Sequence, residues 1–152
     1  MTYKPMSILV RSALIGATLV STLFSNGSFA QEDQREVIAL DNESRAFIVQ
    51  EMHQYVSGLQ QALIALSKDD GKGVASAIRP LGMQGMAKAP AALMKAIPDG
   101  FKQIGMPIHM AFDKIADAAE KGAATSEILS GLGMAMNRCI ACHSAYRIES
   151  KP

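Results

Sequence analysis

The residues with the clearest capacity for chemistry lie together near the carboxyl end of the chain, in the run Cys139-Ile140-Ala141-Cys142-His143. The chain of 152 residues has 2 cysteines, and both are in this run. A C-x-x-C-H run is the signature of c-type haem attachment. Two thiols at this spacing can each bond to one vinyl group of haem, and the adjacent imidazole can ligate the iron from the same side. The motif therefore predicts one haem c, bound covalently through two thioether links to Cys139 and Cys142, with His143 as an iron ligand.

Two other kinds of site use cysteines at this spacing, and the sequence fits them less well. A thioredoxin-like redox pair lies where a strand leads into a helix, whereas this motif is predicted to lie inside a helix. A structural zinc site needs four ligands, and the sequence has no second Cys/His pair. No convergent acid/base set accompanies the motif, so we expect a protein that is not an enzyme.

The first thirty residues have the pattern of an export signal. Lys4 and Arg11 give a basic start, an apolar run follows from Ser12 to Phe24, and Ser28-Phe29-Ala30 places small residues where signal peptidase cuts. After Arg11 the apolar run is too short to span a bilayer. We therefore expect residues 1–30 to be a cleaved signal peptide. The alternative is a retained membrane anchor, because apolar residues also precede Arg11.

The remaining residues, 31–152, have the size of a single domain. The formal net charge of +1 for the whole chain becomes −1 once the two basic residues of the signal are removed. The sequence has no run of Lys or Arg, which argues against a nucleic acid partner. Export predicts a periplasmic location, with no stable membrane insertion after cleavage.

The mature region has a helical composition, rich in Ala, Leu, Ile, Met, Glu, Gln and Lys. Apolar residues at spacings of three and four predict helices over about 44–68, 99–121 and 126–148, and two shorter pieces between 72 and 98. Pro107 is expected to kink the third long helix or to mark its beginning. No alternating segment predicts a strand of useful length. The last helix is expected to turn one stripe to the core: Leu129, Leu132, Met136, Cys139, His143 and Tyr146. The prediction is an all-α fold, an antiparallel four-helix bundle with haem attached near the C-terminus.

The sequence resembles the class II c-type cytochromes, the family of cytochrome c-prime, over its last helix and loosely over its first. The resemblance rests on the C-x-x-C-H motif and on the residues after it, Ser144-Ala145-Tyr146-Arg147. It implies a cytochrome c-prime-like four-helix bundle over residues 31–152. It also implies that His143 is the proximal ligand of the haem iron. Family members transfer electrons in the periplasm or, in some cases, bind small gases to a five-coordinate haem.

The group on the other side of the iron separates these two functions. Met52 is the leading candidate because it lies on the inward stripe of the first helix, and low-spin relatives carry a ligating Met in a similar position. His53, His109 and an open site are the alternatives, and Met52 could also be an ordinary core methionine.

Two residues after the motif are further candidates for the haem site. Arg147 could pair with a haem propionate or influence the proximal His, or it could be a solvated charge that suits the end of a helix. Tyr146 is expected to pack against the haem or within the core.

The sequence thus predicts a mono-haem electron carrier whose partners are periplasmic redox proteins. The alternative is a five-coordinate haem protein that binds nitric oxide or carbon monoxide. Some relatives form dimers through their first two helices, so a homodimer is open here, although the prolines and glycines between 72 and 98 make that region irregular.

Overall fold

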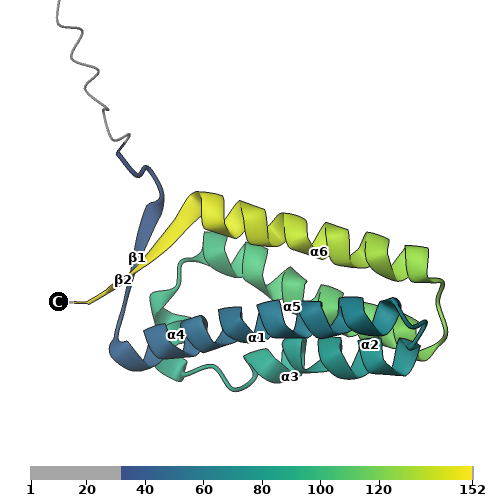
Figure 1. The fold of residues 1–152 in the computed structure, drawn as a ribbon. Coiled ribbons are helices and arrows are strands. Elements are labelled where there is room, and N and C mark those ends of the chain that lie inside the picture. The colour runs from purple at the N-terminus through teal and green to yellow at the C-terminus, as the bar shows by residue number, and fades with distance from the viewer. Residues whose placement is uncertain (1–31, 152) are drawn as a thin grey trace, which may run out of the picture. The chain divides into compact units, whose positions relative to one another are not determined.

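The fold is mostly helical over residues 32–151, which are the residues that this computed structural model describes (Figure 1). The predicted signal peptide, 1–30, lies outside the described residues. In chain order the elements are β1 (Glu36–Leu40), α1 (Asn42–Leu66), α2 (Gly71–Ile78), the short 3₁₀ turn η1 (Arg79–Leu81), α3 (Met83–Met86), α4 (Ala91–Ala96), α5 (Asp99–Glu120), α6 (Thr125–Ala145) and β2 (Tyr146–Ser150). None of the helices in the described range has the length and apolarity that crossing a bilayer requires.

The helices pack in series around one apolar core. α1 lies against α2, α2 against α5, and α5 against α6, with neighbours running in opposite directions (Figure 1). Phe112 of α5 is 1% exposed and lies at the centre, where its ring contacts that of Tyr55. The three long predicted helices are confirmed. The region between 72 and 98 is broken as predicted, but into α2, η1, α3 and α4 and not into two pieces.

Local sequence signals explain some of the helix ends. The Asp41 carboxylate caps α1 by accepting a hydrogen bond of 2.8 Å from the Ser44 backbone N–H. Gly122 has a φ of 78° and follows α5, as predicted for a left-handed stop. α5 continues through Pro107, so the suggestion that this proline begins the helix is wrong. The bond that Pro107 cannot donate would go to the carbonyl of Gln103, an exposed residue, so water can take its place while the following turns stay buried.

The two strands were not predicted from the sequence. β1 and β2 pair in parallel, with Glu36 opposite Tyr146 and Leu40 opposite Ser150. The last helix therefore ends at Ala145 and not near Ile148, because the residues that follow pair with β1. Burial stabilises this arrangement, since Ile38 and Leu40 of β1 are 3% and 0% exposed in a second apolar cluster with α4.

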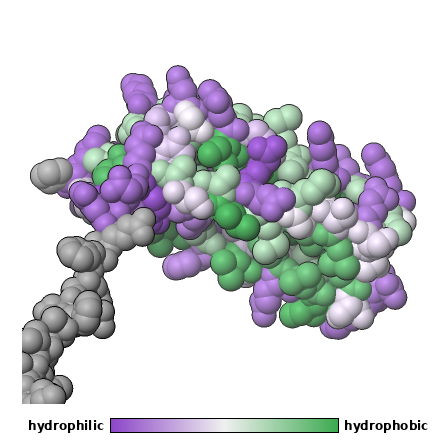
Figure 2. Space-filling model, turned by 90° about the horizontal axis from the view of Figure 1, so that it is seen from above, coloured by the Kyte–Doolittle hydropathy of each residue, from purple (hydrophilic) through white to green (hydrophobic). Residues whose placement is uncertain are grey.

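The buried face of α6 also differs from the prediction. Leu132 is buried as expected, but the other fully buried residues of α6 are Ile128 and Ala135, while Leu129 and Met136 are 45% and 50% exposed. His143, which was also predicted on the inward stripe, is exposed as well. The reason is that α6 packs closely on one neighbour, α5, and turns its buried stripe toward it. Figure 2 looks down on α6 and shows apolar residues on this exposed surface.

The capping carboxylate of α1 gives a pH-dependent test of the fold. The hydrogen bond from the Ser44 N–H lowers the pKa of Asp41, so its contribution to stability is present above the ordinary carboxyl pKa and is lost as pH falls through the lowered value. We expect Asp41→Ala to lower the thermal midpoint by a few degrees at neutral pH. The difference from wild type should shrink in acid, whereas Asp41→Asn, which caps without titrating, should change little. A pH series of thermal unfolding curves measures both effects.

Candidate functional site

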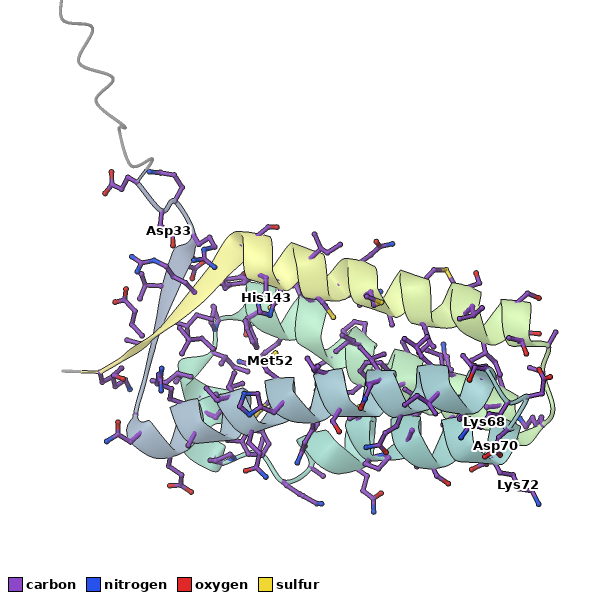
Figure 3. All side chains as sticks on the ribbon, viewed as in Figure 1. Asp33, Met52, Lys68, Asp70, Lys72 and His143 are labelled. Atoms are coloured by element: carbon purple, nitrogen blue, oxygen red, sulfur yellow. The ribbon has the colours of Figure 1, made fainter. Side chains whose placement is uncertain are left out.

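A cavity of about 450 Å³ opens between α1, α5 and α6 at the end of the protein that carries the strands. The six predicted site residues all line it: Met52, Cys139, Cys142, His143, Tyr146 and Arg147. His143 and Met52 come from opposite sides, His143 from α6 and Met52 from α1, and both lie toward the space between these helices (Figure 3). The volume lies within the range of roughly 300–1,000 Å³ found for small-molecule and cofactor sites.

The two cysteines lie on the cavity side of α6 and are half-buried, and they form no disulfide. Burial raises the pKa of the Cys139 thiol, and burial together with Cys139 raises the pKa of Cys142. A reactive redox pair has the opposite property, a lowered thiol pKa, often at the start of a helix. Cys142 instead lies in the last turn of α6. Within residues 32–151, the structure has no cluster of three or more His, Cys, Asp or Glu residues that could hold a metal ion.

The carboxyl end of α6 is tied to the segment before β1. Arg35 Nη1 donates a hydrogen bond of 3.3 Å to the backbone carbonyl of His143. The same guanidinium forms an ion pair of 2.7 Å with Asp33 and, with its hydrogen bonds, lowers the pKa of that carboxyl to about 2. Sequence analysis missed Arg35 because 108 positions separate it from His143, and the strand pairing that brings it near had no signal.

Tyr146 and Arg147 lie on β2, immediately beyond α6. The Tyr146 ring meets Phe101 edge to face, with ring centroids 5.5 Å apart, and both rings line the cavity. A side chain at Gly100 would collide with the Tyr146 hydroxyl, so this close approach requires glycine. Phe101 and the backbone at Gly100 therefore hold Tyr146 in the cavity wall.

Arg147 was predicted one helical turn after His143, and this is wrong because β2 replaces the end of that helix. Its guanidinium pairs with Glu149, and its Nε lies 3.7 Å from the Asp33 carboxylate. Arg35 and Arg138 also line the cavity. Arg35 and Arg147 already pair with Asp33 and Glu149, so Arg138 is the cavity arginine that has no ion pair among the described residues.

The wall beside Met52 contains a buried polar group formed by Glu51, Tyr55 and His109. His109 is 5% exposed, and its Nδ1 donates to the Leu81 carbonyl at 2.9 Å. With that proton on Nδ1, Nε2 accepts from the Tyr55 hydroxyl at 3.2 Å. The Glu51 carboxyl lies 3.8 Å from Nε2, and burial raises its pKa. Both ring nitrogens of His109 are thus occupied by protein partners.

The other two candidates for a distal iron ligand have simpler surroundings. His53 lines the cavity but is an exposed residue on α1. Met52 is half-buried, packs against both apolar clusters and lines the cavity. A thioether needs no hydrogen-bond partner, so Met52 can lie half-buried in this wall without one.

The fold and site define a mostly helical protein with an apolar cavity between a C-x-x-C-H motif and a methionine. Comparison of the chain with protein-family models, with curated proteins and with solved structures gives no match. The residues of the site are therefore the basis for assigning a function.

Proposed function

We propose that the mature protein, residues 31–152, is a periplasmic mono-haem c-type cytochrome that carries single electrons between redox proteins. In this proposal it has the four-helix bundle of the class II c-type cytochromes, which its motif resembles. The observation that carries the proposal is that one cavity unites Cys139, Cys142, His143 and Met52. These residues provide two thiols for attachment and one donor for each face of an iron.

The residues of the cavity fit a haem in three respects. The thiols form no disulfide and are half-buried beside the cavity. The lining is mostly apolar, with the rings of Phe101 and Tyr146 against one side. Arg138 lines the cavity without an ion pair among the described residues and could pair with a haem carboxylate.

Each of several residues would have its own role in electron transfer. The haem, when bound, supplies a centre that gains or loses one electron. His143 and Met52 would ligate its iron from opposite helices, a pairing that raises the reduction potential. The hydrogen bond from Arg35 to the His143 carbonyl fixes the backbone of the proximal ligand. Met/His ligation would also keep the iron low-spin, so little rearrangement would accompany the gain or loss of an electron.

The alternative function within this proposal is binding of nitric oxide or carbon monoxide at a five-coordinate haem. It requires that Met52 does not ligate the iron, so that the distal side can accept a diatomic gas. The mostly apolar lining of the cavity favours this alternative, because a diatomic gas needs an apolar pocket on the distal side. Carrier and gas binder therefore differ in one coordinate bond.

Optical spectra of the holoprotein, oxidised and reduced, separate these functions. The carrier predicts a low-spin spectrum with the weak sulfur-to-iron charge-transfer band, and no change when carbon monoxide is added to the reduced protein. A high-spin spectrum that shifts on adding carbon monoxide would favour the gas binder. A protein with no haem spectrum after expression with haem-attachment machinery would contradict both.

A further inference from the structure

A second and much smaller cavity lies next to the proposed haem cavity, between the first turns of α1, the segment that carries α4, and the start of α5. Ile48, Phe101 and His109 line both cavities and so form a shared wall. The volume of the second cavity is about 40 Å³. One water needs roughly 10–15 Å³ of such space, so this cavity has room for a single ion and not for an organic molecule.

Three methionines from three different helices line this second cavity, called here the methionine cavity. Met86 ends α3, Met94 lies on α4 and Met106 lies on α5, and all three are half-buried. Four of the chain's ten methionines fall between positions 83 and 106, so this part of the chain is enriched in thioethers. Methionine often fills irregular gaps in a core, but side chains that only fill a gap close the space between them, whereas these three surround a cavity.

The polar side chains that line the methionine cavity leave few other donors for a ligand. Both ring nitrogens of His109 bond to protein groups, as described above. The Lys102 ammonium donates a hydrogen bond of 3.1 Å to the Asp99 carboxylate. The Glu51 carboxyl lines the cavity as well and can supply one negative charge to balance a bound cation. The remaining lining residues are apolar, so the thioethers are the main donors that the cavity offers.

This set of donors selects among metal ions. Thioether sulfur is a soft ligand that suits Cu(I), whereas Mg²⁺ and Ca²⁺ prefer oxygen, and Zn²⁺ prefers thiolate, imidazole and carboxylate. We infer that the methionine cavity is a binding site for one Cu(I) ion, with Met86, Met94 and Met106 as its ligands. Each of these side chains has three rotatable bonds, which lets its sulfur adjust to the ion. The site does not depend on haem attachment, because none of the three methionines lines the proposed haem cavity.

Equilibrium dialysis of the purified mature protein against Cu(I), without oxygen and with bound copper measured by mass spectrometry, tests the site. Wild type is expected to bind one Cu(I) per chain and to bind Zn(II) much more weakly. Met94→Leu and Met106→Leu should each raise the Kd for Cu(I) by about 100-fold, because each removes one of three ligands and keeps an apolar side chain of similar volume. Met110→Leu is the matched control, since Met110 lies on the same helix as Met106 but is 50% exposed and does not line the cavity.

The variants decide where a bound ion lies. Circular dichroism checks that each keeps its helices, and Met86→Leu provides a third variant from a different helix. If the purified protein carries no haem, the variant with both cysteines replaced by serine is dialysed in its place, so that free thiols do not compete for Cu(I).

Three results would overturn the inference. The first is a wild type that takes up no Cu(I), and the second is a wild type that binds Zn(II) as tightly as Cu(I). The third is equal weakening of Cu(I) binding by Met110→Leu, or no weakening by any of the three cavity variants, which would assign the ion to exposed thioethers elsewhere on the protein.

Discussion

Met52→Ala is expected to turn a haem that ignores carbon monoxide into one that binds it. Removing the thioether leaves His143 as the one protein ligand on the iron, so the reduced protein should become high-spin and its spectrum should shift when carbon monoxide is added. The reduction potential should also fall, because the Met/His pair is the arrangement that raises it. Optical titration with carbon monoxide and redox potentiometry measure these effects.

Matched variants make the Met52 result specific. Met94→Ala removes another half-buried methionine, one that packs in the second apolar cluster and does not line the cavity, so it should leave the haem spectrum unchanged. His109→Leu should preserve the low-spin spectrum, because both ring nitrogens already bond to protein groups. An unchanged spectrum in Met52→Ala combined with a high-spin spectrum in His109→Leu would show that His109, and not Met52, is the distal ligand of the iron.

Replacing both cysteines with serine is expected to abolish covalent haem attachment. A serine hydroxyl cannot form the thioether link, so any haem still held by His143 should be lost when the protein is denatured in acidified organic solvent. Each single variant should retain one link and a changed haem spectrum. Haem staining of denaturing gels, with total protein as the reference, gives the comparison.

A structural role for the cysteines would instead appear as a loss of helical structure when serine replaces them in the apoprotein. They form no disulfide, so Cys139→Ser and Cys142→Ser remove only two half-buried sulfurs from the apoprotein. The folded apoprotein should therefore keep its helical circular dichroism. Retention of haem on denaturing gels by the double variant would contradict attachment at these residues.

The sequence was sufficient to predict the elements that local patterns determine. Long amphipathic repeats gave α1, α5 and α6 to within a few residues, and the left-handed Gly122 marked the end of α5. The six predicted site residues also proved to line one cavity, because the motif lies on a helix that faces α1 and α5. These features depend on residues that are close together in the chain.

Features that depend on distant residues could not be read in this way. β1 and β2 have five residues each, and their pairing joins segments about 110 positions apart, so neither shows a strand pattern by itself. That pairing moved Arg147 off the helix and brought Arg35 to the His143 carbonyl. The buried face of α6 was misjudged because exposed apolar residues such as Met136 obscure its periodicity. The polar group around His109 could not be predicted, because the sequence does not show that Leu81 and Tyr55 lie next to His109.

Covalent haem attachment at the C-x-x-C-H motif can be decided from the mass of the denatured protein, isolated from the periplasm after expression with haem-attachment machinery. We expect a single species that begins at Gln31 and carries the mass of one haem, with neither cysteine available to a thiol-alkylating reagent. A mature chain without added mass, whose Cys139 and Cys142 are both alkylated, would show that the protein is not a c-type cytochrome.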